Sequence, residues 1–247
     1  SDYITLDNLT ITRGRGANIW VGEDGPALNF SLTDSIVTNV VTMDNAALVR
    51  LDKATNFLVH NNSIHGLVAG GDSNAVGNGI VLFQSVNGDI TNNEIYDIKN
   101  GGNFGNGIYH KHSTSYALSG VSTIANNYIH DVNNRCVVLS AHKYTVRNNL
   151  LKNCPEAGIL LFESAGTCGA QGNTLDHNTI VDSPRGIILT RPDSGGGCDG
   201  AEDTVVKNNL VDRCTSGEYR CLSVWKYVSG DKDAYDVLRL MRGTATE

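Results

Sequence analysis

Short runs in which apolar and polar residues alternate recur along the chain, and most of them are punctuated by an asparagine pair. The clearest copies have the form apolar-x-Asn-Asn-x-apolar, with their second asparagines at Asn62, Asn93, Asn127, Asn149, Asn178 and Asn209. Alternation with a period of two predicts β-strands. The asparagine pairs predict sharp bends between the strands, because asparagine tolerates the left-handed backbone conformation.

A second strand-like signature follows each asparagine pair after a loop of variable length. It is a glycine or cysteine followed by a strand-like run, found at residues 79–82, 107–110, 136–139, 158–161, 186–189 and 221–224. Together with weaker copies near the N-terminus, at residues 6–11 and 32–37, these signatures define about eight units of three short strands. The shortest unit is the 22 residues from 127 to 149. Such a repeat predicts stacked coils.

The predicted fold is therefore all-β: a right-handed parallel β-helix, or solenoid, of about eight coils that spans residues 1–230. Asparagine amides at the bends are expected to form a buried ladder of hydrogen bonds along the stack. Residues 231–241 instead show the pattern of a short amphipathic helix. Residues 231–247 are therefore predicted to form a C-terminal helical cap that covers the open end of the stack.

The six cysteines favour disulfides over a metal site. None of them forms a CxxC pair, so zinc binding is not favoured, and an even count points to a secreted, extracellular or periplasmic protein. The repeat register predicts three local bridges, whereas Cys154 and Cys214 have simple core packing as an alternative. The predicted bridges are Cys136–Cys154, Cys168–Cys198 and Cys214–Cys221.

The composition and net charge of the chain argue against two classes of binding partner. A hydrophobic content of 40% with 18% charged residues is typical of a globular protein with a sizeable core. A net charge of −7 argues against a general nucleic-acid binder. No apolar run approaches the roughly 18 residues of a membrane span, so we expect neither a membrane nor a nucleic acid as partner. We expect the protein to be a monomer.

Coils built from Asn-Asn-x-Ile and Gly-Ile-x-Leu resemble those of the right-handed parallel β-helix proteins. These include pectate, alginate and chondroitin lyases, polygalacturonase-type hydrolases and mannuronan epimerases. The resemblance covers nearly the whole chain and implies a carbohydrate partner, but a shared fold does not fix an activity. The Gly-His-Gly, Asp-Pro-His and Arg-x-Pro-x-x-Arg segments of such families do not occur here, so no residue role is transferred.

The densest cluster of titratable side chains lies at residues 106–113, in the middle of the array. Strand alternation predicts that Tyr109 and Lys111 point outward from their strand and that His110 points inward. His112 falls at the strand end. The cluster is therefore predicted to present Tyr109 and Lys111 on the outer surface of the solenoid.

Charge around this stretch differs from the rest of the chain. Between residues 98 and 155 there is a single acidic residue, Asp131, and four histidines. A basic groove in an acidic protein would suit a polyanion. His142 and Lys143 lie just past the corresponding strand of the next coil. The six basic residues of this region are Lys99, Lys111, Arg135, Lys143, Arg147 and Lys152.

These residues suggest β-elimination on an acidic polysaccharide such as alginate or pectate. The reaction needs a base for the C5 proton, an acid for the leaving oxygen and a group that neutralises the carboxylate. The predicted base is Lys111, the predicted acid is Tyr109 or Arg191, and the predicted neutralising residues are His112, His142 and Lys143. The residues predicted to bind substrate are Arg50, Phe83, His110, Tyr116, Arg135 and Glu163. A calcium ion is an alternative way to neutralise the carboxylate, although no acidic cluster with ligand spacing stands out.

Two other functions stay open. A glycoside hydrolase needs two neighbouring carboxylates on one face, and outward acids on these strands are sparse, with Asp52 on a strand and Glu163 at a strand end. A non-catalytic carbohydrate-binding module, such as an adhesin or tailspike-like domain, needs only exposed aromatic residues. Candidates for that role are Trp20, Phe83, Phe162 and Trp225.

Overall fold

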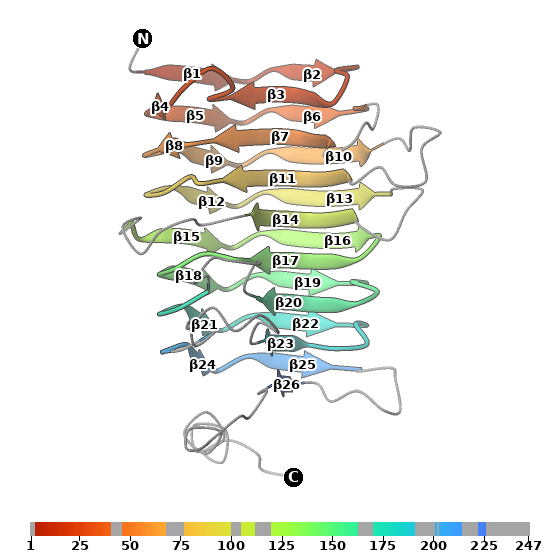
Figure 1. Ribbon diagram of the computed structural model, residues 1–247. Helices are drawn as coiled ribbons and strands as arrows, with labels where there is room; N and C mark the ends of the chain where they lie inside the picture. The colour runs from red at the N-terminus through yellow and green to blue at the C-terminus, as the bar shows by residue number, and fades with distance from the viewer. Residues whose placement is uncertain are drawn as a thin grey trace.

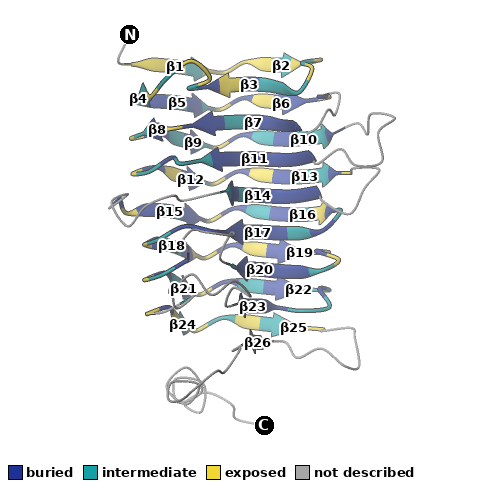
Figure 2. Ribbon diagram, viewed as in Figure 1, coloured by how far each residue is buried: buried dark blue, intermediate teal, exposed yellow. Residues whose placement is uncertain are grey.

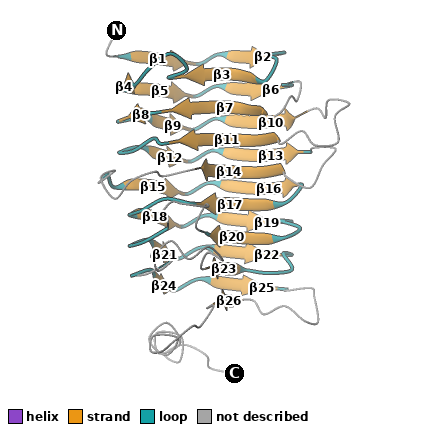
Figure 3. Cartoon of the chain, viewed as in Figure 1, coloured by secondary structure: helices purple, strands orange, loops and turns teal. Residues whose placement is uncertain are grey.

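The chain forms a three-sided solenoid. The computed structural model describes residues 3–40, 46–67, 77–99, 105–111, 120–162, 170–190, 201, 203–213 and 222–225. These residues form 26 strands and no helix (Figures 1 and 3). Three parallel sheets, here named A, B and C, contain eight strands each, so the described residues trace eight coils as predicted. The predicted cap at residues 231–247 lies outside the described residues.

Each coil contributes one strand to each of the three sheets. Sheet A contains β1 (Ile4–Asp7), β5 (Phe30–Thr33), β9 (Leu58–His60), β12 (Asp89–Thr91), β15 (Ser122–Ala125), β18 (Tyr144–Arg147), β21 (Thr174–Asp176) and β24 (Val205–Lys207). Sheet B contains β2 (Thr10–Thr12), β6 (Ile36–Thr38), β10 (Ser63–Leu67), β13 (Glu94–Ile98), β16 (Tyr128–Val132), β19 (Leu150–Lys152), β22 (Thr179–Val181) and β25 (Leu210–Asp212). Sheet C contains β3 (Ala17–Val21), β7 (Ala46–Asp52), β11 (Gly77–Phe83), β14 (Gly105–Lys111), β17 (Arg135–Leu139), β20 (Ala157–Leu161), β23 (Ile187–Thr190) and β26 (Leu222–Trp225). A small extra sheet pairs β4 (Ala27–Leu28) with β8 (Ala54–Thr55).

The interior is filled by columns of similar apolar side chains, one residue per coil. Parallel pairing aligns residues of the same repeat position, so the alternation in each strand becomes a column along the stack. In sheet A one such column runs through Leu32, Val59, Ile90, Ile124, Val146 and Leu175, all of them buried. Figure 2 shows this burial across the middle coils, while β1 and β2 of the first coil are largely exposed. The apolar residues of the alternating pattern therefore form the core of the protein.

The asparagine pairs form the corner between sheets A and B. The first residue of every pair adopts the left-handed conformation, with φ between 50° and 58°. Asparagine fills this position in most coils because it carries a smaller penalty there than other side chains. The predicted bends are confirmed. The eight residues are Asn8, Asp34, Asn61, Asn92, Asn126, Asn148, His177 and Asn208.

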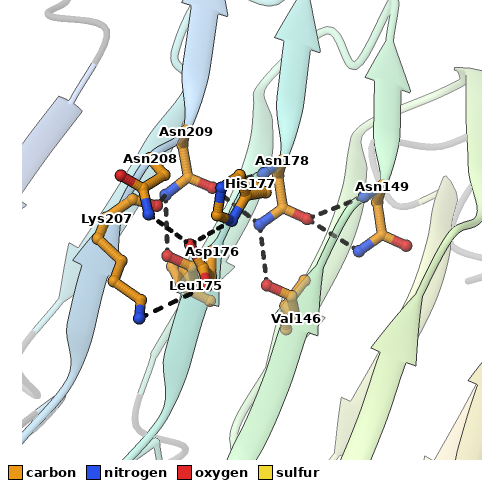
Figure 4. A network of polar contacts seen from close by, with 9 residues as sticks. All are labelled: Val146, Asn149, Leu175, Asp176, His177, Asn178, Lys207, Asn208 and Asn209. Atoms are coloured by element: carbon orange, nitrogen blue, oxygen red, sulfur yellow. Dashed lines mark hydrogen bonds and ion pairs between the residues drawn. The ribbon is translucent and has the colours of Figure 1, made fainter.

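The second residue of each pair points inward and forms the predicted ladder (Figure 4). Asn127, for example, donates one amide hydrogen to Asn149 Oδ1 at 3.0 Å and the other to the carbonyl of Ile90 at 2.9 Å. Its own Oδ1 accepts hydrogen bonds from the backbone N–H and the side chain of Asn93. The same pattern continues through Asn178, so each buried amide is satisfied by the coils on either side.

The glycine that opens the second signature is required by close packing between sheets. A Cβ atom on Gly107 would lie 2.4 Å from Cγ2 of Ile129 and 2.6 Å from the carbonyl oxygen of Cys136. A Cβ atom on Gly79 would meet Ile95 in the same way, at 2.7 Å. The backbone of sheet C thus lies directly against the isoleucines of sheet B, which leaves no room for a side chain.

One of the three predicted disulfides falls within the described residues and is confirmed. Cys136 at the start of β17 is bonded to Cys154, which follows β19 in the next coil, with the Cα atoms 5.5 Å apart. Both cysteines are buried, so the bridge joins two neighbouring coils inside the core. The partners predicted for Cys168 and Cys214 lie, with those cysteines, outside the described residues.

Replacing a central member of the asparagine ladder should cost more stability than replacing its last described member. Asn127→Ala would orphan the amide of Asn93 and the carbonyl of Ile90, and each buried orphan costs about 1–3 kcal/mol. We expect a loss of about 2–6 kcal/mol in the free energy of unfolding. Asn209→Ala, at a partly exposed position, should cost less than half as much. Urea denaturation of both variants measures this, and equal losses would contradict a ladder that stabilises from both sides.

Candidate functional site

The outer face of sheet C presents the residues that strand alternation predicted. Its first column joins, in register, Trp20, Arg50, Val81, Tyr109, Val138, Leu160 and Ile188. A second column, two residues further along the strands, joins Asp52, Phe83 and Lys111. Tyr109 and Lys111 therefore lie on the outer side of β14, beside Val81 and Phe83 of the preceding coil.

Tyr109 is a partly buried phenol at the centre of this face. Its ring lies near Phe162, with the ring centroids 6.2 Å apart. Burial raises the pKa of Tyr109 above its ordinary value of 10.0, and the nearby Arg135 guanidinium opposes that rise. The phenol therefore keeps its proton at neutral pH, as a general acid requires.

Beyond Tyr109 the outer face becomes apolar. Val138, Leu160 and Ile188 point outward, yet all three are buried and form a small cluster separate from the interior core. Tyr109 and Phe162 border this cluster. The polar groups of sheet C are thus concentrated on β3, β7 and β14, on the N-terminal side of the cluster.

At the N-terminal end of sheet C three side chains are locked together. The Arg50 guanidinium lies over the ring of Trp20, 4.4 Å from its centroid. Arg50 Nε donates to both carboxylate oxygens of Asp52 at 3.0 Å, and Trp20 Nε1 donates to Oδ2 at 3.0 Å. Arg50 thus lies on the outer face, as a substrate-binding residue would, with Phe83 on the adjacent strand.

His110 lies inside the solenoid, as its register predicts, between Leu82 and Leu139. Its side chain is 1% exposed, and neither ring nitrogen has a hydrogen-bond partner among the described residues. Burial, with a smaller effect from His142, lowers the pKa of His110 to about 3. A polymer on the outer face cannot reach this ring, so the prediction that His110 binds substrate is wrong. The outward alternation of Tyr109 and Lys111 forces the residue between them inward.

The ring of His110 has an aromatic neighbour in the interior. Tyr144 approaches it edge-on, with the ring centroids 5.4 Å apart. Burial raises the pKa of Tyr144, and Ser122 moderates that rise, although the phenol oxygen has no hydrogen bond of normal geometry to a described residue. The polar interior at this level is therefore poorly satisfied compared with the asparagine ladder.

His142 and Lys143 lie at the edge of sheet C, in the corner that leads to sheet A. Lys143 is exposed and adopts the left-handed conformation, with φ of 57°. His142 Nδ1 accepts a hydrogen bond from the Gln171 backbone N–H at 3.3 Å. Burial and, second, the Lys143 charge lower the pKa of His142 below 6.5. At neutral pH His142 is therefore uncharged, and of this pair only Lys143 offers a positive charge to a carboxylate.

Arg135 is already paired. At the start of β17 its Nη2 forms a close ion pair with Glu156 Oε2, and Arg185 lies 3.9 Å from the other oxygen of the same carboxylate. A bound polyanion would have to compete with Glu156 for this guanidinium. Four further predicted site residues lie outside the described residues: His112, Tyr116, Glu163 and Arg191.

The basic residues of the central region do not form one groove. A coil visits all three sides of the solenoid, so residues that are close in sequence are distributed around its perimeter. Of this set, Lys111 lies on sheet C, whereas Arg147 ends a strand of sheet A and Lys152 ends a strand of sheet B. Lys99 follows β13 of sheet B and pairs with Asp97 at 2.6 Å. The prediction of a single basic groove is therefore wrong for these residues.

The family follows from comparison with known proteins. A family model described as a right handed beta helix region matches residues 1–180 and 106–223. This chain belongs to that family. The sequence matches none of the curated proteins with which it was compared. The right-handed β-helix fold fits carbohydrate-active proteins, among them polysaccharide-acting enzymes, and adhesin-like proteins.

Sheet B of this β-helix carries an outward aromatic column that the sequence analysis did not identify. His65, Tyr96 and His130 are in register, with the ring centroids of His65 and Tyr96 4.6 Å apart and those of Tyr96 and His130 5.2 Å apart. Tyr128 also stacks on His130, at 4.1 Å. A signal was present, because each column residue directly follows the isoleucine of an Asn-Asn-x-Ile motif.

No metal centre is assigned. The described residues contain no group of three or more histidine, cysteine, aspartate or glutamate side chains placed to hold an ion. The predicted calcium ion therefore stays a prediction without ligands assigned to it. Within the described ranges, no helix is long and apolar enough to cross a membrane.

Acid should destabilise the protein partly through His110. The unfolded chain binds a proton at this residue below about pH 6.5, whereas the folded chain does so only near pH 3. Between these values, protonation of this group in the unfolded chain should lower the free energy of unfolding by up to about 1.4 kcal/mol for each unit by which the pH is lowered.

The comparison variant is His110→Leu, which matches the leucines above and below it. We expect this variant to be more stable at pH 7, by about 1–3 kcal/mol, because unpartnered polar atoms leave the core. It should also lose less stability between pH 6.5 and pH 4. Urea denaturation at several pH values measures both effects, and parallel curves for the two proteins would refute the assignment.

Proposed function

We propose that this protein is a secreted polysaccharide lyase that cleaves an acidic, uronic-acid-containing polysaccharide by β-elimination on the outer face of sheet C. The proposal joins two properties of that face. Its polar part combines aromatic and cationic side chains in register along the stack, and its central strand, β14, carries a protonated phenol and an amine. A polymer chain lying along the solenoid axis would cross both.

The main support for the proposal is the location of the unsatisfied buried polar groups. Buried side-chain polar atoms without a hydrogen-bond partner occur between residues 106 and 144, on residues that include Asn106, His110, Arg135 and Tyr144. Each such group costs about 1–3 kcal/mol. Such costs are typical of sites kept for function rather than stability. They coincide with the coils that present Tyr109 and Lys111.

In the proposed reaction Lys111 removes the C5 proton of a uronate. The electron pair forms the C4–C5 double bond, and the C4–O glycosidic bond breaks. Tyr109 donates its proton to the departing oxygen, which its raised pKa permits. Lys143 is the described residue that best balances the substrate carboxylate, and His142, neutral at neutral pH, contributes no charge.

A glycoside hydrolase is less well supported. It needs one carboxyl group that holds a proton as general acid. Asp52, the acid that lies in a column of this face, has both oxygens bound by Arg50 Nε and one by Trp20. Both oxygens are thus engaged by neighbouring side chains, which favours a binding or structural role for Asp52.

Incubation with alginate, polygalacturonate and chondroitin sulfate tests the activity. A lyase releases products with an unsaturated, ultraviolet-absorbing end on at least one substrate. Tyr109→Phe and Lys111→Ala should each lower kcat about a hundredfold or more, since general acids and bases contribute factors of about that size. The control is Lys152→Ala on sheet B, which should leave kcat unchanged.

Three results would count against this proposal. Reducing ends without ultraviolet absorbance would indicate a hydrolase. Binding without any product would indicate a carbohydrate-binding module. Unchanged kcat in both sheet C variants, with cleavage intact, would remove Tyr109 and Lys111 from the mechanism.

A further inference from the structure

The Trp20, Arg50 and Asp52 side chains form a surface that is fixed before any ligand arrives. Arg50 uses its Nε and Nη2 groups on Asp52, with Nη2 2.9 Å from Oδ2, and its guanidinium covers one side of the Trp20 ring. Asp52 is only 7% exposed, so it holds both partners from below. The indole N–H bond to the same carboxylate sets the orientation of the Trp20 ring.

Despite these contacts Trp20 remains 44% exposed, more than Phe83 or Tyr109 on the same face. Its strand, β3, is the edge strand of sheet C among the described residues. Arg50 in β7 covers one side of the indole, and the ring remains exposed elsewhere. A planar ligand could therefore stack on the indole without displacing any described strand.

The charges of this cluster indicate what kind of ligand fits. The positive charge of Arg50 is balanced by Asp52 at hydrogen-bond distance, so the surface offers little net attraction for an anion. What it offers is an indole ring held in a fixed orientation by Arg50 and Asp52. The C–H groups of a pyranose ring carry slight positive charge and complement the negative face of an aromatic ring.

We propose that Trp20 is the platform of a remote subsite that binds one sugar ring of the polysaccharide by stacking. This inference rests on the proposed function, because it places the subsite on the same polymer path as Tyr109 and Lys111. Trp20 is separated from Tyr109 by three strand spacings, about 14 Å. Only a substrate several sugars long spans both positions, and Val81 and Phe83 line the way between them.

The subsite therefore makes the enzyme sensitive to chain length. Trp20→Ala should raise KM for long oligosaccharides by about two- to tenfold, the range expected for one aromatic stacking contact, and leave kcat unchanged. For substrates too short to reach it, neither parameter should change. Trp20→Phe should retain part of the effect because it keeps a stacking ring. Tyr3→Ala removes an exposed aromatic residue elsewhere at the same end of the solenoid and is the matched control.

A binding measurement keeps this inference separable from the catalytic one. The sequence contains two tryptophans, so Trp225→Phe leaves Trp20 as the only indole. Titration of this variant with alginate and polygalacturonate oligosaccharides of increasing length, in the Lys111→Ala background, should change the emission of Trp20 in a saturable manner. The affinity should rise with oligosaccharide length.

The possible results point to different conclusions. Cleavage that persists with unchanged KM in Trp20→Ala, together with no change in emission, would overturn the subsite and leave the lyase intact. A saturable emission change, with no unsaturated product from the unsubstituted protein, would contradict the proposed lyase activity and support Trp20 as a sugar-binding residue. Trp20-dependent dimers in sedimentation, with no response to sugars, would show that a second copy of the chain covers the indole, which would also overturn the subsite.

Discussion

The buried amide of the asparagine ladder is the interaction on which the rest of the solenoid depends. Each inner asparagine both donates to and accepts from the neighbouring coils, so a coil can enter the stack only in one register. That register aligns the apolar columns in all three sheets at once. A shift by one residue would place a polar side chain in every column and break the ladder on both sides. Hydrogen bonding at one corner thus determines packing throughout the coil.

This constraint also determines where the chain is free to vary. Most inward positions are held to apolar residues or to the ladder asparagine, so differences between coils accumulate at outward positions and in the loops at the corners. A functional surface is therefore assembled from the same outward position in successive coils, as in the column from Trp20 to Tyr109. Residues adjacent in sequence contribute to different sides, which explains why a basic stretch does not become a basic groove.

The periodic part of the molecule was predictable from sequence for the same reason. The asparagine positions, the outward columns of sheet C and the Cys136–Cys154 bridge depend only on the repeat register, which the sequence displays directly. Contacts between outward side chains carry no such period. The Trp20–Asp52 hydrogen bond joins residues 32 positions apart, and nothing in the repeat distinguishes it from two solvated side chains. Pairing of Arg135 with Glu156 was missed for this reason too.

At His110 the packing of the interior conflicts with the residues that the same strand carries on the outer face. Its column is otherwise apolar, and leucines occupy the position in the coils on either side. No packing argument favours a buried imidazole without hydrogen-bond partners over a third leucine. The same strand, however, carries Tyr109 and Lys111 outward, and the buried ring lies close enough to His142 for that neighbour to add to the effect of burial in lowering the pKa of His110. A fold that satisfies the buried amides of the asparagine ladder but leaves this ring unsatisfied has given up stability at one level of the stack. That level is the one where the proposed chemistry takes place.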